Sequence, residues 1–138
     1  MARILSIDYG LKRTGIAVTD PLQIIATGLT TIHPKELITF LKDYFAKEPV
    51  ELILIGWPTN WDDTATHATP HVEKCIKELQ KKFPAIPVKK VDERYTSKMA
   101  KDAMLEMGLK KMQRRNKAVV DAIAATIMLQ EYVRSSHF

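Results

Sequence analysis

Residues 51–56, with the sequence ELILIG, are the feature that most constrains the fold of this chain. A continuous apolar run of this length is typical of a β-strand that is buried on both faces. Such a strand needs other elements of secondary structure packed on each side of its sheet. We therefore expect an α/β domain.

Apolar and β-branched residues predict four further strands, which cover residues 3–8, 15–19, 25–32 and 86–91. Residues 10–14 connect the first two of these strands, and Gly10 and Gly15 allow the backbone to turn there. We therefore expect the chain to open with a β-hairpin.

Apolar side chains at helical spacing predict four helices, one beginning at Pro34 and the others covering residues 72–83, 97–107 and 118–133. Three successive strands, followed by helices that alternate with two more strands, indicate an α/β domain with a five-stranded mixed sheet. No linker, repeat or low-complexity segment divides the sequence, so we expect residues 1–138 to form a single domain.

Composition narrows the class of protein. The chain has 46% hydrophobic and 27% charged residues, which excludes intrinsic disorder and fibrous architectures for most of its length. Its single cysteine, Cys75, permits no intrachain disulfide and suits a reducing compartment. No segment has the pattern of a signal peptide or a membrane span. We therefore expect a cytoplasmic protein with no membrane partner.

Positive charge is concentrated in one segment. The chain carries 21 Lys and Arg against 16 Asp and Glu, a net charge of +5. Seven of the basic residues fall close together, namely Lys98, Lys101, Lys110, Lys111, Arg114, Arg115 and Lys117. Such a cluster is a usual footprint of nucleic-acid binding, but a solvated lysine-rich face has the same composition. Charge alone leaves both interpretations open.

Three acidic residues stand in apolar surroundings. Asp8 ends the first predicted strand, Glu93 follows a later one, and Asp121 lies inside the apolar run of the last helix. An unpaired carboxylate in such a setting costs on the order of several kcal/mol unless it is paired or bound to metal. If the last helix crosses the strand ends, the three could converge on Mg²⁺ or Mn²⁺. Each also has a simpler explanation, as a turn residue, a partner of Arg94 or a surface position.

Three longer motifs carry a resemblance to a known family. They are DYGLKRTGIAV at residues 8–18, VDERYT at residues 91–96 and VDAIAATIMLQ at residues 120–130. In this order and spacing they resemble the YqgF family, bacterial RNase H-like nucleases described as Holliday junction resolvases and as pre-16S rRNA nucleases. The resemblance implies an RNase H-like fold, in which the first three strands are antiparallel and helices cover both faces of the sheet.

The resemblance also implies a site and a reaction. Asp8, Glu93 and Asp121 would be the catalytic residues and metal ligands of a nuclease that hydrolyses phosphodiester bonds with Mg²⁺, or alternatively Mn²⁺. From their positions, Lys12, Arg13 and Arg94 beside the motif acids could hold flanking phosphates. The basic residues of the later cluster would track the nucleic-acid backbone, namely Lys110, Lys111, Arg114, Arg115 and Lys117. An ordinary surface cation is an equally good explanation for each of those near the acids.

The sequence indicates the type of reaction more clearly than the nucleic acid that serves as substrate. The resemblance favours 5′-end maturation of precursor 16S rRNA, a step of ribosome biogenesis, over resolution of branched DNA in recombination and repair. Symmetric resolution of a four-way junction calls for two active sites, and the sequence allows a monomer or a homodimer.

Two other classes of function compete with a nuclease. A sugar-kinase-like or actin-like ATP-binding protein also opens with an Asp-x-Gly hairpin, but it needs two related domains. A non-catalytic nucleic-acid-binding module has no need for a carboxylate at Asp121.

Several other residues can be explained either by a structural role or by a functional one. Trp57 and Trp61 could stack on unpaired bases or form a hydrophobic lid. We expect His33 to cap a helix, His71 to lie in a first helical turn rather than at a metal site, and Cys75 to be a packing residue.

Overall fold

A computed structural model of the chain describes residues 2–57, 69–92 and 117–136. In chain order, its elements are β1 (Arg3–Tyr9), β2 (Thr14–Thr19), β3 (Ala26–Ile32), the 3₁₀ helix η1 (Pro34–Glu36), α1 (Leu37–Lys47), β4 (Val50–Trp57), α2 (Thr69–Lys82), β5 (Val88–Asp92) and α5 (Lys117–Ser136). The predicted helix over residues 97–107 lies outside the described residues.

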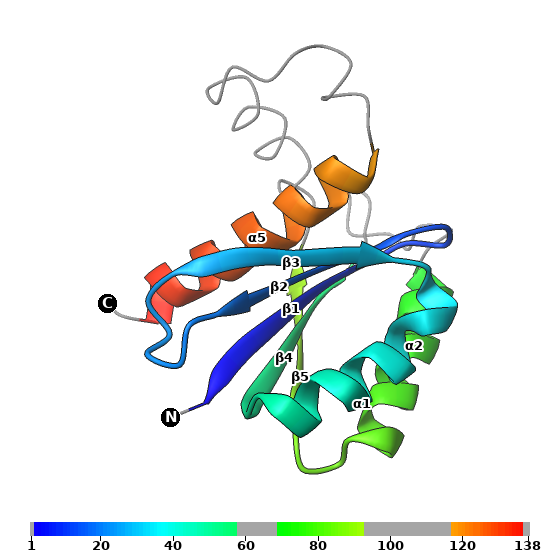
Figure 1. The fold of residues 1–138 in the computed structure, drawn as a ribbon. Helices are drawn as coiled ribbons and strands as arrows, with labels where there is room; N and C mark the ends of the chain where they lie inside the picture. Colours follow the sequence, from blue (N-terminus) through cyan, green and yellow to red (C-terminus); the bar gives the residue numbers. More distant parts are fainter. Residues whose placement is uncertain (1, 58–68, 93–116, 137–138) are drawn as a thin grey trace.

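The five strands form one sheet in the order β3-β2-β1-β4-β5. Neighbouring strands among β1, β2 and β3 are antiparallel, whereas β4 is parallel to both β1 and β5. α1 and α2 cover one face of this sheet, and α5 crosses the other (Figure 1). The predicted fold class, a five-stranded mixed sheet with helices on both faces, is confirmed.

Strand alternation divides the core into two layers. Leu5 and Ile7 of β1 pack with Leu41 of α1 and other side chains on the face that α1 and α2 cover. Ile4, one residue away, packs with Leu129 on the α5 face. The same alternation holds along β4, where consecutive apolar side chains serve opposite faces. The continuous apolar run at residues 51–56 therefore belongs to a strand that is buried on both faces, as predicted.

The helix predicted at Pro34 begins with a 3₁₀ turn before the α-helix starts at Leu37. Proline at the first turn removes an amide that would have no partner there. Nδ1 of His33 accepts a hydrogen bond from the Lys35 amide at 3.1 Å, so the predicted capping role of this histidine is confirmed.

Two predicted strands begin later in the structure than in the sequence analysis. The first is β3, which starts at Ala26 because the Ile25 amide donates to Oδ1 of Asp20 in the preceding turn. The second is β5, which starts at Val88 rather than residue 86. There the Ile86 amide donates to the Phe83 carbonyl, and Pro87 has no amide hydrogen to donate.

The sheet has one edge at which β1, β4 and β5 all end, at Tyr9, Trp57 and Asp92 respectively. The antiparallel strand β2 begins at this same edge, with Thr14 opposite Tyr9. We call it the carboxyl edge, and in α/β proteins it is where ligand sites commonly form. Within the described part of the chain, no helix is both long and apolar enough to cross a membrane.

Candidate active site

Asp8 lies on β1 at the carboxyl edge, on the face of the sheet that α5 covers. Ile4 belongs to the core layer beneath α5, and the Ser6 hydroxyl donates to a carbonyl of α5. Because side chains alternate along a strand, Asp8 shares this face with Ile4 and Ser6. Its side chain is half-buried. The carboxylate therefore stands where the sheet ends, held by the rigid central strand.

The hairpin that follows Asp8 leaves room around it. Asp8 pairs with Gly15 of β2, a residue that has no side chain to crowd the carboxylate. Gly10 begins the connection, and a Cβ atom there would lie 2.5 Å from the Arg13 carbonyl oxygen. Only glycine fits this backbone approach. The glycines of the first sequence motif thus shape the hairpin that carries Lys12 and Arg13.

A hydrogen bond fixes the register between α5 and β1. Oγ of Ser6 donates to the carbonyl of Ala125 at 3.0 Å, and both residues are buried. The helix runs antiparallel to β1, because its first turn lies toward the carboxyl edge and its last toward the opposite edge (Figure 1). The Ala26 amide, near that opposite edge, donates to Oε1 of Gln130 late in the helix.

This register brings the backbone of Asp121 to the level of Asp8. Asp8 lies two residues beyond Ser6, about 7 Å along an extended strand. Asp121 lies four residues before Ala125, about 6 Å along a helix in the same direction. Two of the three predicted acids therefore come from elements that meet at one point of the carboxyl edge.

The third predicted acid, Glu93, lies outside the described residues, as do Arg94, Lys110, Lys111, Arg114 and Arg115. Glu93 directly follows Asp92, the last residue of β5, which pairs with Trp57 at the carboxyl edge. Lys117 is the first residue of α5. Among the side chains that the structure describes, which do not include those of Asp92 and Asp121, no group of three or more His, Cys, Asp or Glu has a metal-binding arrangement.

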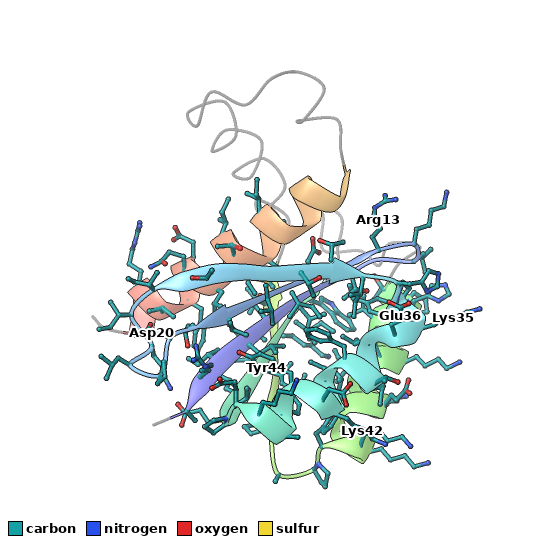
Figure 2. All side chains as sticks on the ribbon, viewed as in Figure 1. Arg13, Asp20, Lys35, Glu36, Lys42 and Tyr44 are labelled. Carbon is teal, nitrogen blue, oxygen red and sulfur yellow. The ribbon has the colours of Figure 1, made fainter. Side chains whose placement is uncertain are left out.

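The predicted phosphate-binding residues Lys12 and Arg13 lie on the connection between β1 and β2. Figure 2 shows Arg13 on this connection and Lys35 of η1 at the same end of the sheet. Asp20 lies at the other end. Positive side chains therefore border the carboxyl edge.

Trp57 takes part in packing at the end of β4. Its ring is partly buried against the core layer beneath α1 and α2, and Nζ of Lys90 lies 4.0 Å from the ring centroid. A cation at this distance makes a favourable contact with the ring face. The lid interpretation of Trp57 is thus favoured over free stacking on bases, whereas Trp61 lies outside the described residues.

The sequence analysis missed Ser6 as a residue of this site. The signal was present, since Ser6 is the one polar side chain between Ile4 and Ile7 of a buried strand. A buried hydroxyl needs a hydrogen-bond partner, and the fold provides the Ala125 carbonyl.

The predicted roles of two other residues hold: His71 lies in the first turn of α2, and Cys75 is buried in the core.

Comparison with known proteins agrees with this architecture. Residues 2–135 match the family model RuvX, described as Holliday junction resolvase. A relative in Christiangramia forsetii, named as a candidate pre-16S rRNA nuclease, is 56% identical over 96% of this chain and 98% of its own length. One of the same name in Bacteroides thetaiotaomicron is 54% identical over the full length of both chains.

A solved structure of Thermus thermophilus RuvC in complex with a Holliday junction substrate superimposes with a TM-score of 0.60. The superposition covers 99% of this chain and 96% of that one, at 16% sequence identity. At this identity the likeness establishes a shared fold, which is the RNase H-like fold that the sequence motifs imply. The family match and the two relatives show that the chain belongs to the RuvX family, the YqgF family of the sequence motifs.

Proposed function

We propose that this chain is a metal-dependent nuclease that cleaves phosphodiester bonds in precursor 16S rRNA, with Asp8, Glu93 and Asp121 as its catalytic acids. Membership of the RuvX family makes the chain an enzyme that acts on nucleic acid. The choice of precursor 16S rRNA is supported by the names of the relatives in Christiangramia forsetii and Bacteroides thetaiotaomicron.

The observation that carries the proposed site is the register between β1 and α5. The Ser6 to Ala125 hydrogen bond sets the backbone of Asp121 level with Asp8, which is half-buried at the carboxyl edge. Two carboxylate-bearing residues from distant parts of the sequence are thereby held on rigid elements. Such preorganisation is what a hydrolytic metal site requires.

The chemistry of these side chains suits a hard divalent cation. Carboxylate oxygens are the ligands that Mg²⁺ and Mn²⁺ prefer, and we propose that Asp8, Glu93 and Asp121 hold Mg²⁺, or Mn²⁺ in its place. A cation bound there would lower the pKa of the attacking water and stabilise the departing oxygen. Asp8 would orient the ion from the centre of the sheet. Lys12 and Arg13 would hold a neighbouring phosphate by charge-assisted hydrogen bonds.

We further propose that residues 1–138 act as a single nuclease domain. The packing of α5, from the C-terminal part, on β1, β2 and β3 from the N-terminal part supports this proposal. The basic residues Arg94, Lys110, Lys111, Arg114, Arg115 and Lys117 would track the nucleic-acid backbone and make binding salt-dependent.

A second candidate substrate is the four-way DNA junction. The description of the RuvX family as Holliday junction resolvases favours it. Symmetric junction cleavage needs two active sites, so this candidate requires a homodimer, whereas cleavage of one rRNA strand needs a single active site.

One experiment separates the two substrates. The protein is incubated with Mg²⁺ and either 5′-extended 16S rRNA or a four-way DNA junction, and its mass in solution is measured in parallel. We expect cleavage of the rRNA, and loss of that cleavage in Asp8→Asn and Asp121→Asn. Efficient paired nicking of the junction by a dimer, with no action on the rRNA, would replace the first candidate by the second. Full activity of both variants would overturn the proposed site.

A further inference from the structure

A hollow lies at the carboxyl edge, on the face of the sheet opposite to Asp8. It has a volume of about 370 Å³ and lies between the end of β1, η1, the start of α1 and the first three turns of α2. Tyr9 forms part of its wall. Because Asp8 and Tyr9 are consecutive residues of one strand, their side chains point to opposite faces. The hollow, which we call the Tyr9 pocket, is therefore back to back with the candidate active site.

The inner part of the Tyr9 pocket is apolar. Tyr9, Leu37 and Ile38 line it and pack against the core layer beneath α1 and α2. Leu11, on the connection between β1 and β2, also lines the pocket, and 53% of its surface is exposed. An exposed leucine at the border of a concave apolar surface is a position that a flat hydrophobic ligand would cover.

The outer part of the Tyr9 pocket is polar and mainly cationic. Lys35 of η1 and Lys74 of α2 contribute ammonium groups, His33 and His71 contribute imidazoles, and Glu78 contributes a carboxylate. All five residues are exposed. Nδ1 of His33 accepts from the Lys35 amide, so a neutral His33 carries its proton on Nε2 as a donor. The pocket therefore combines donors for a phosphate with an apolar surface for a ring.

Tyr9 adds a hydroxyl donor to this set. The Tyr9 side chain lines the pocket, and its phenol O–H can donate a hydrogen bond. The volume of the pocket lies within the range of small-molecule sites, roughly 300–1,000 Å³.

We propose that the Tyr9 pocket binds one nucleotide of a single-stranded nucleic acid, with the base against Leu11 and Ile38 and a phosphate between Lys35 and Lys74. This inference rests on the proposed function, and it assigns the pocket to a nucleotide that flanks the bond cleaved at Asp8. The strand would pass around the carboxyl edge, where Lys12 and Arg13 lie between the two faces. The pocket would then help to set which position along a strand reaches the catalytic acids.

The test measures binding separately from cleavage. A fluorescein-labelled single-stranded RNA 10-mer is titrated with the full chain in EDTA, and its anisotropy is followed. The double variant Lys35→Glu/Lys74→Glu alters the pocket. The matched control, Lys42→Glu/Lys77→Glu, reverses the charge of two exposed lysines on α1 and α2 that do not line the pocket. Figure 2 shows Lys42 farther along α1, away from the carboxyl edge. Both variants change the net charge equally, so bulk electrostatics cancels in the comparison.

We expect the pocket variant to weaken binding about tenfold more than the control. A second variant, Leu11→Ser, removes apolar contact without a charge change and lies at an exposed position, so it keeps the test open if the double variant does not fold. It should also weaken binding severalfold. Equal affinities of the pocket and control variants, or an unchanged affinity of Leu11→Ser, would overturn the proposal.

Imidazole NMR signals give a direct readout of the pocket. Adenosine 5′-monophosphate added in EDTA should shift the ring signals of His33 and His71, assigned from His→Gln variants. Inorganic phosphate alone should cause smaller shifts, because it lacks the base. Equal shifts with both probes would contradict a nucleotide site. If the unsubstituted protein shows these shifts but does not cleave the rRNA, that result would count against the proposed active site and not against the pocket.

Discussion

The Ser6 hydroxyl donates a hydrogen bond to the Ala125 carbonyl across 3.0 Å, and this bond joins residues that are 119 positions apart in the sequence. Both groups are buried between β1 and α5. The contact does not touch the candidate catalytic acids, yet it sets the height of α5 along β1. Through it, Asp8 and the backbone of Asp121 meet at one edge of the sheet.

Ser6→Ala should therefore impair catalysis more than folding. Loss of one buried hydrogen bond costs about 0.5–1.5 kcal/mol of unfolding free energy. A small shift of α5 would move Asp121 relative to Asp8, and misplacement of catalytic groups by about 1 Å lowers rates by up to about 100-fold. We expect cleavage to fall about tenfold, measured beside urea unfolding.

Thr19→Val is the matched control for Ser6→Ala. Oγ1 of Thr19 accepts a hydrogen bond from the Ile4 amide at 2.9 Å, at the opposite end of the sheet. Removal of the Thr19 hydroxyl should lower the unfolding free energy at least as much as Ser6→Ala does. The cleavage rate of the folded protein should stay unchanged. If both variants lose activity in proportion to stability, Ser6 has only a structural role.

Gly10→Ala should distort the hairpin between β1 and β2. The added Cβ would lie 2.5 Å from the Arg13 carbonyl oxygen, a backbone atom that cannot rotate away. Forced contacts of this kind cost about 1–3 kcal/mol. Thermal unfolding should show this loss, whereas Leu11→Ala at the exposed neighbouring position should stay within about 0.5 kcal/mol. An unchanged melting temperature for Gly10→Ala would show that the hairpin tolerates a side chain.

Asp20 should make folding stability depend on pH in the acid range. Hydrogen bonds from the Ile25 and Ile24 amides lower the pKa of this carboxyl from its ordinary 3.8. Because the folded-state pKa is lowered, the stabilisation is complete above the unfolded-state pKa. It is lost as the pH falls through the folded-state value. Urea unfolding at several pH values below 5 should therefore show a shallower acid decline for Asp20→Ala. Identical slopes would contradict the assignment.

Cys75 should resist thiol reagents in the folded protein. Burial, assisted by Glu78, raises the pKa of its thiol from 9.0 to about 12. Thiol reagents react with the thiolate form, and at pH 8 a thiol with so high a pKa is almost entirely protonated. The reaction with Ellman's reagent should be at least about 100-fold slower in native buffer than in denaturant. A rapid native reaction would show that the thiol is accessible.

Local sequence patterns were sufficient to predict the strands and helices that lie in the described part of the chain. The apolar run at residues 51–56 predicts the two-faced strand β4, and the spacing of Val72, Ile76 and Leu79 predicts α2, all three of which are buried. These signals depend on periodicity along one element. The late starts of β3 and β5 were missed because they depend on turn hydrogen bonds at Ile25 and Ile86, which periodicity does not encode.

The site was only partly predictable for a different reason. Asp8 and Asp121 stand out as acids in apolar runs, but the register that brings them level depends on one tertiary hydrogen bond. The Tyr9 pocket has no sequence motif, since its walls come from β1, η1, α1 and α2. Glu93 and the basic residues between 98 and 115 lie outside the described residues, so their roles stay predictions.

Cleavage of 5′-extended 16S rRNA by Asp8→Asn, with Mg²⁺, tests the central claim most directly. The matched control is Asp43→Asn, which makes the same change at an exposed position of α1. We expect Asp8→Asn to lose activity by about 10³-fold or more while remaining folded, because a metal ligand is removed. Asp43→Asn should cleave as fast as the unsubstituted protein. An Asp8→Asn protein that cleaves at the unsubstituted rate would contradict the account.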